Sequence, residues 1–237
     1  MIEENVQEQE EFPESRPAEK ERIIDRVLTR EVTLKGITFQ MVDILFTACL
    51  FILAFLIRWK LMPIESADYF GFLEPWMEAI RTNGGWRSLS MEISNYTSPY
   101  MYIMTLLSYI STNDLYALKL VSVAFDYFAA IAVLRILYHM TGNLRKSILG
   151  MAVLLLSPTV IIDSAYWCQC DIIYTSFLLY SYLYFLEDDG EKSAIFFGLS
   201  FMFKLQAVFL LPFFVIMWLK KRTIRLEYYL WVPAIYF

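Results

Sequence analysis

The chain alternates between long apolar runs and short polar segments from about residue 39 onward. A membrane-spanning helix needs about 20 mostly apolar residues, so these runs predict an all-α, polytopic bundle of transmembrane helices. The pattern gives six crossings and an incomplete seventh, that is, about 6–7 spans. The corresponding runs are 39–57, 115–138, 148–162, 172–186, 194–211, 213–219 and the half-length run 228–237.

The apolar segment 100–112 has thirteen residues, which suits an interfacial or re-entrant helix better than a span. If it crossed, Arg145 and Lys146 would lie outside, against the tendency of basic loops to stay in the cytoplasm. The basic residues nearest the first span likewise predict a cytoplasmic N-terminus; they are Arg22, Arg26, Arg30 and Lys35. The first run lies too deep in the chain for a cleaved signal peptide, so we expect a multi-pass protein of the plasma membrane.

Composition supports a membrane environment, because 58% of the residues are hydrophobic and 17% are aromatic. Residues 1–36 hold ten acidic and six basic residues, which accounts for −4 (six minus ten) of the net charge of −5. This segment is expected to be an acidic, largely disordered cytoplasmic tail, followed by one transmembrane module over 37–237. The sequence has no basic patch that would indicate nucleic-acid binding. Its three cysteines indicate neither a disulfide framework nor a metal site.

The segment 58–99 after the first span is rich in carboxylates, aromatic rings and amides. Residues 69–82 predict a short amphipathic helix on the membrane surface, interrupted by Pro75 and ended by the Gly pair 84–85. A connection between spans does not need so large a polar loop, so we interpret it as a site. Asp68 is the first catalytic candidate, and the other candidates in this loop are Glu65, Glu74, Trp76 and Tyr96.

The predicted topology brings two further polar clusters to the same outer face. One is the loop 163–171, which carries Trp167, Gln169 and Asp171; the other comprises Lys204 and Gln206, with Lys119 near the outer start of its own span. An intramembrane lysine costs about 2.5–3.5 kcal/mol on insertion scales, so Lys204 needs a partner such as a phosphate. Aromatic rings and carboxylates suit a sugar, and an aspartate can act as general base on an acceptor hydroxyl.

Simpler interpretations stand beside these. Asp68 can be a solvated loop carboxylate, the tryptophans and Arg58 can mark the interface, and Lys204 can snorkel or pair with a carboxylate. Asp126 inside a span can be structural or functional. The pattern alone fits a transporter or lipid-handling protein as well as an enzyme, although we see no internal repeat of the kind that transporters often show.

Five segments appear in an order that resembles bacterial multi-pass glycosyltransferases of the GT-C superfamily, in particular those related to the GPI-anchor mannosyltransferases. They are SADYFGFLEPWMEAIRTNGG, NYTSPYMYIMTLLSYI, DLYALKLVSVAFDYFAA, SPTVIIDSAYWCQCD and FKLQAVFLLP, within residues 39–212. The resemblance implies transfer of a hexose, with mannose favoured, from a polyprenyl-phosphate donor to a glycan, lipid or protein acceptor at the extracytoplasmic face. It implies no certain cofactor, although some members use a divalent cation that Asp68 with Glu65 could bind.

The resemblance also implies individual roles. Asp68 would be the base in an inverting displacement, with Glu65 and Glu74 in reserve. The W-x-Q-x-D pattern places Trp167, Gln169 and Asp171 in the sugar or acceptor pocket, and the K-L-Q pattern places Lys204 and Gln206 at the lipid phosphate, with Lys119 as a further phosphate contact.

The chain departs from the family at two points. Members commonly have glycine where this chain has Cys168, and they usually have more spans. The chain therefore resembles the N-terminal part of such an enzyme, and an inactive fragment is the remaining alternative.

Overall fold

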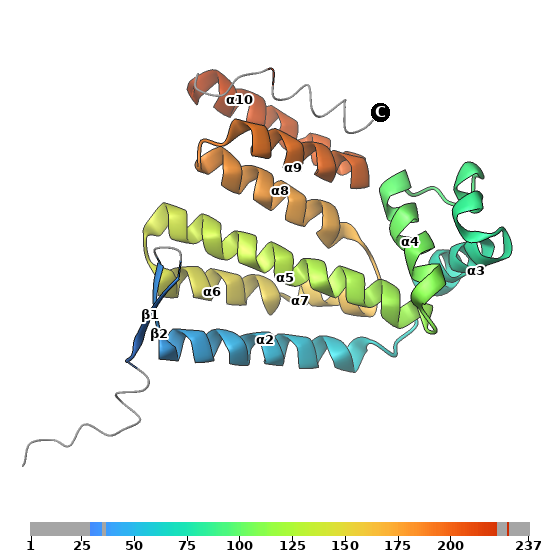
Figure 1. Cartoon of the computed structure of the whole chain (residues 1–237), viewed down its shortest axis with the longest axis horizontal. Coiled ribbons are helices and arrows are strands. Elements are labelled where there is room, and N and C mark those ends of the chain that lie inside the picture. Colours follow the sequence, from blue (N-terminus) through green and yellow to red (C-terminus); the bar gives the residue numbers. More distant parts are fainter. Residues whose placement is uncertain (1–28, 35–36, 222–226, 228–237) are drawn as a thin grey trace, which may run out of the picture. The chain divides into compact units, whose positions relative to one another are not determined.

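The structure, a computed structural model, describes residues 29–34, 37–221 and 227 (Figure 1). The chain divides into two units, Met1–Phe46 and Thr47–Phe237. The described part of the first unit is an antiparallel hairpin of β1 (Glu31–Leu34) and β2 (Ile37–Gln40), followed by the start of α2 (Met41–Leu61). The pattern did not predict this hairpin, and the rest of the predicted acidic tail, residues 1–28, lies outside the described residues.

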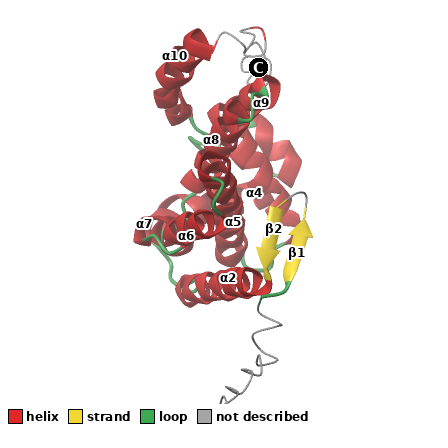
Figure 2. Cartoon of the chain, turned by 90° about the vertical axis from the view of Figure 1, so that its left-hand side faces the viewer, coloured by secondary structure: helices red, strands yellow, loops and turns green. Residues whose placement is uncertain are grey.

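The second unit is helical, as predicted (Figure 2). Helix α5 (Asp114–Thr141) packs against both α6 (Leu144–Leu155) and α8 (Asp171–Leu186), and α8 packs in turn against α9 (Gly190–Phe203) (Figure 1). The tight connection between α5 and α6 follows from two residues. Gly142 ends α5 at a φ of +62°, a region that glycine occupies without strain, and Asn143 caps α6 by accepting a hydrogen bond from the Lys146 amide.

Among the described residues, two helices, α2 and α5, are long and apolar enough to cross a membrane. A third span results if α6 is counted together with the segment Pro158–Tyr166, which is bent away from it by 48°. This segment comprises α7 (Pro158–Ile161) and the π-helical turn η3 (Ile162–Tyr166). The predicted count of about 6–7 spans is therefore not confirmed over the described residues.

The span predicted over 194–211 is divided into separate elements. Helix α9 ends at Phe203 because Lys204 is extended, with a φ of −156° and a ψ of 127°. A 3-10 helix, η4 (Leu205–Leu210), and α10 (Leu211–Lys221) follow. The run predicted as a half-span, 228–237, lies outside the described residues.

The loop after α2 folds into short helices. The π-helical turn η1 (Tyr69–Leu73) runs into α3 (Glu74–Thr82), and η2 (Gly85–Ser90) and α4 (Ser98–Ile110) follow. Pro75 does not interrupt the predicted helix, because it lies in the first turn of α3, where a proline costs no intrahelical hydrogen bond. The predicted short helix over 100–112 corresponds to α4.

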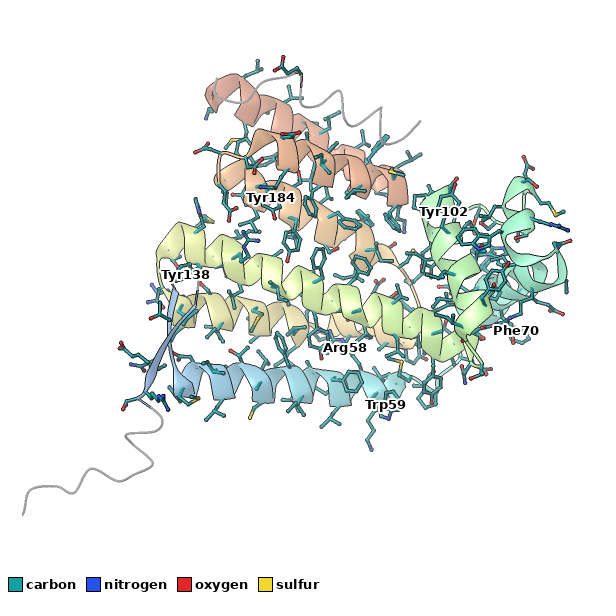
Figure 3. All side chains as sticks on the ribbon, in the orientation of Figure 1. Arg58, Trp59, Phe70, Tyr102, Tyr138 and Tyr184 are labelled. Carbon is teal, nitrogen blue, oxygen red and sulfur yellow. The ribbon has the colours of Figure 1, made fainter. Side chains whose placement is uncertain are left out.

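Arg58 was interpreted as a residue that snorkels to the interface, and this was wrong. Its side chain is fully buried and points from α2 toward the neighbouring helices (Figure 3), whereas Trp59 beside it is half-exposed. The Arg58 Nε donates to Asp126 Oδ2 at 2.7 Å, and Ser164 Oγ donates to the same oxygen at 2.6 Å. Nη1 donates to the carbonyls of Ala54 and Leu155 at 3.1 and 3.0 Å. Asp126 is thus the structural partner that the sequence allowed.

Candidate functional site

Asp68 and Gln169 meet although they are 101 residues apart in the chain. The Gln169 Nε2 donates to Asp68 Oδ2 at 2.7 Å, and its Oε1 accepts a hydrogen bond from the Tyr96 hydroxyl at 3.0 Å. Asp68 lies directly before η1, and π-helical turns are frequent at functional sites. The structure therefore joins three of the predicted site residues in one hydrogen-bonded chain.

Hydrogen bonds of the main chain also hold Gln169 in place. The backbone N–H of Gln169 donates to the Asp163 carbonyl at 2.9 Å, and the backbone carbonyl of Gln169 accepts from Ser122 Oγ at 2.8 Å. Ser66 secures the other side, because its hydroxyl donates to the Trp167 carbonyl at 2.7 Å. The loop of Asp68 and the loop of Gln169 are consequently fixed to each other, and Asp68 is presented in a defined orientation.

Asp68 opens into a small hollow of about 150 Å³. The hollow combines one carboxylate and two amides with aromatic rings, the combination that suits a sugar. Its lining residues are Asp68, Phe72, Leu73, Trp76, Asn95, Tyr96 and Gln169. Trp76 packs edge-on against Tyr96, with ring centroids 5.3 Å apart. Burial raises the pKa of Tyr96 well above its usual range, so its hydroxyl stays protonated and remains a hydrogen-bond donor.

A second hollow of about 550 Å³ shares Asn95 and Tyr96 with the first. Thr97, from the same loop before α4, also lines it. The opposite wall comes from the end of α9 and from η4, and comprises Phe203, Lys204, Leu205, Gln206, Val208 and Phe209. The loop before α4 is attached to this wall, because Thr97 Oγ1 donates to the Phe203 carbonyl at 2.8 Å. The predicted phosphate contacts, Lys204 and Gln206, therefore line a hollow next to that of Asp68.

Lys204 forms an ion pair with Asp171 at the start of α8, and its ammonium lies 5.9 Å from the centre of the Tyr174 ring. The carboxylate of Asp171 thus balances the charge of the Lys204 ammonium. Pairing with a carboxylate was one of the two simpler interpretations of this lysine. The ammonium remains partly exposed to the larger hollow. Asp171 lines neither the hollow of Asp68 nor the hollow of Lys204. Its connection to the second hollow is its ion pair with Lys204.

Comparisons with known proteins identify no relative. No family model matches the chain, no curated protein matches it, and no solved structure matches it. The fold and the site are accordingly interpreted from their own geometry, together with the ordered segments described above.

Besides Asp171, four of the predicted site residues lie outside the two hollows. Glu65 and Glu74 line a different hollow from Asp68, and the Trp167 ring is half-exposed, outside both hollows. Lys119 is fully buried, and its ammonium donates to the carbonyls of Leu61, Met62 and Ile64 at 3.2, 3.3 and 2.6 Å. Lys119 thus hydrogen-bonds to carbonyls at the end of α2 and does not line the hollow of Lys204.

Sequence reasoning missed Asn95, which lines both hollows. Asn95 begins the pattern Asn95-Tyr96-Thr97, which matches a glycosylation sequon, and so short a pattern often recurs by chance. The signal that could have identified it is its position beside Tyr96, at the end of a polar loop and directly before an apolar helix. For metals, the described residues contain no group of three or more His, Cys, Asp or Glu side chains able to hold an ion.

Cys168 and Cys170 are buried on either side of Gln169 in the chain. Burial raises the pKa of each thiol to about 12, so neither ionises near neutral pH. Cys168 has a φ of +64°, a left-handed conformation that costs a residue with a Cβ roughly 1–2 kcal/mol. A glycine at this position would adopt this conformation without strain.

Replacing Cys168 with glycine is expected to leave stability within about 1 kcal/mol of wild type, because relief of the left-handed strain offsets the lost burial of the thiol. Cys168→Ala removes the sulfur without relieving the strain, so it should be the less stable of the two. Thermal unfolding of the purified protein in detergent compares them. An alanine variant more stable than the glycine variant would contradict the backbone explanation.

Proposed function

We propose that the chain is a membrane glycosyltransferase of the GT-C type, which transfers a hexose, with mannose favoured, from a polyprenyl-phosphate donor to an acceptor at the outer face of the membrane. The observation that carries the proposal is the pair of adjoining hollows. One holds a carboxylate oriented by Gln169, and the other holds the ammonium of Lys204. The ordered segments that resemble GT-C enzymes, and the two to three apolar helices, support the same conclusion.

Each hollow would contribute a different part of the reaction. The Asp68 carboxylate accepts the proton of the acceptor hydroxyl while the hydroxyl oxygen attacks the anomeric carbon. The bond from that carbon to the phosphate oxygen breaks, and configuration is inverted. Lys204 and Gln206 stabilise the negative charge of the departing lipid phosphate. Trp76 and Tyr96 offer ring faces to the sugar between these two groups.

The surfaces next to Lys204 suit a lipid-linked donor. Phe203, Leu205 and Phe209 line the larger hollow, and an apolar groove of about 320 Å³ lies beyond it. The groove is lined by α8, η4 and α10 through Thr175, Leu178, Leu179, Tyr182, Leu210, Phe213 and Phe214. The same groove favours a lipid-handling protein without transferase activity as the second candidate.

The proposal predicts that membranes containing this chain transfer labelled hexose from polyprenyl-phosphate mannose or polyprenyl-phosphate glucose to endogenous acceptors. Membranes from the same host without the chain provide the background, and the preferred donor identifies the sugar. Lys204→Met should raise the KM for the donor by roughly tenfold or more, because a hydrogen bond to a charged phosphate is lost. Donor binding without transfer would support the second candidate instead.

A further inference from the structure

A third hollow of about 570 Å³ lies on the other face of the η1–α3 segment and shares no residue with the hollows of Asp68 and Lys204. Asp68, Phe72 and Trp76 occupy one side of this segment, whereas Tyr69, Glu74 and Glu78 occupy the other. The full lining is Glu65, Tyr69, Glu74, Glu78, Arg81, Thr82, Asn113, Asp114 and Leu115. Neither the proposed transfer reaction nor its substrates use this surface.

The hollow is strongly acidic. Four carboxylates line it against one guanidinium, which leaves a net charge of −3 (one minus four). That guanidinium is already occupied, because Arg81 pairs with Asp114 through two nitrogens and also donates to the carbonyls of Ser108 and Ser111 at 3.3 and 3.4 Å. Within the described part of the chain, Glu65, Glu74 and Glu78 have no cationic partner. The hollow therefore favours a positively charged ligand.

Tyr69 provides a second and independent indication of a ligand. Its side chain is only 6% exposed, yet it lines the hollow, and its hydroxyl has no hydrogen-bond partner among the residues that the structure describes. Burial, followed by the charge of Glu74, raises the pKa of Tyr69 to about 12, so the hydroxyl stays neutral. The ring is enclosed while the hydroxyl oxygen remains accessible, so the hydroxyl faces the hollow, where a ligand can form a hydrogen bond with it.

The arrangement of the carboxylates discriminates between kinds of cation. A metal ion requires several ligands within about 2.6 Å of one point, and the described residues contain no group of three or more that meets this need. The carboxylates instead surround a wide space, which suits charges distributed along an organic molecule. The Tyr69 hydroxyl adds a hydrogen-bond acceptor to the same lining, whereas the Asn113 side-chain oxygen already accepts from the Tyr116 amide at 3.1 Å.

We propose that this hollow binds a small organic polycation with primary ammonium groups. Each ammonium would donate hydrogen bonds to one or two of Glu65, Glu74 and Glu78, and one of them would also reach the Tyr69 hydroxyl. Because the three glutamates are exposed, binding should weaken as salt is added. The proposal does not rest on the transferase function, since the two sites have no residue in common.

Calorimetric titration of the full chain in detergent micelles with spermidine tests the proposal, at low ionic strength and about pH 6, where glutamates are ionised and amines protonated. Spermidine is expected to bind, and diacetylspermidine, which keeps one of the three charges on the same backbone, at least about tenfold more weakly. The triple variant Glu65→Gln, Glu74→Gln, Glu78→Gln should lose about tenfold or more in affinity, and Tyr69→Phe about threefold.

Glu92→Gln is the matched control, because Glu92 is an exposed glutamate of the same loop that lies outside the hollow. It should bind spermidine as wild type does. Equal loss in Glu92→Gln and in the triple variant would show non-specific attraction to an acidic surface and would overturn the proposal. Displacement of spermidine by equimolar Mg²⁺ would also overturn it, since the hollow would then be a site for an inorganic cation.

Discussion

Asp68→Asn is expected to lower hexose transfer from the polyprenyl-phosphate donor by about 10²–10⁴-fold, the usual contribution of a general base. Asparagine has nearly the same shape as aspartate, and its side-chain oxygen can still accept the 2.7 Å hydrogen bond from Gln169 Nε2. The loop should therefore keep its position while the proton acceptor is lost. The loss should appear in kcat, with little change in the KM for the donor, because the substitution removes an interaction made in the transition state.

Label transfer in membranes measures this effect, with expression and thermal unfolding of each variant as the test of folding. Glu92→Gln is again the matched control, since it removes a loop carboxylate that lines none of the three hollows. It should transfer at the wild-type rate. Wild-type transfer by a folded Asp68→Asn protein would exclude Asp68 as the base and would leave the adjoining hollows without a catalytic group.

The second large effect concerns the buried pair Arg58–Asp126. Each single replacement, Arg58→Met or Asp126→Leu, is expected to destabilise the protein by about 3–5 kcal/mol, because it leaves the other charge buried without a partner. Both side chains are fully buried, and one nitrogen of Arg58 and one oxygen of Asp126 already lack a hydrogen-bond partner. The surroundings therefore have little capacity to satisfy a charge that is left alone.

The double variant Arg58→Met, Asp126→Leu should be more stable than either single variant, because apolar side chains replace the pair as a whole. It should not fully recover, since the Leu155 carbonyl and the Ser164 hydroxyl each lose a partner. Unfolding by increasing fractions of a denaturing detergent gives all three stabilities in one double-mutant cycle. Additive destabilisation in the double variant would contradict the pairing.

Much of the fold follows from the apolar pattern, and the failures have identifiable physical causes. The helices α2, α4, α5 and α8 were predicted because long continuous runs of apolar residues are typical of helices in a membrane protein. The break at Lys204 was not predicted, because apolar residues continue on both sides of it and an extended backbone leaves no signature in hydropathy. The predicted span count is not confirmed over the described residues, where α8 and α9 are only 16 and 14 residues long.

Part of the candidate site was predictable and part was not. Asp68 and Tyr96 come from the loop 58–99 and Gln169 from the loop 163–171, two segments that polarity had grouped at one face, and the three residues form one chain of hydrogen bonds. Arg58 was misplaced because it stands beside Trp59 and Lys60, which favour an interface, whereas its true partner lies 68 residues away. Side-chain pairing across that separation depends on which faces of two helices meet, and a single sequence does not contain this information.

The hydrogen bond from Arg58 to the Leu155 carbonyl has a mechanical consequence. If α2 slid or rotated by one turn, the guanidinium would leave both Asp126 and that carbonyl and would expose two buried charges to an apolar surrounding. The part of α2 around Arg58, together with α5 and the bent pair of α6 and α7, should accordingly move as a single block. A motion that admits a bulky ligand to the hollows would then involve η4 and the loop before α4, which the Thr97–Phe203 hydrogen bond connects to the end of α9.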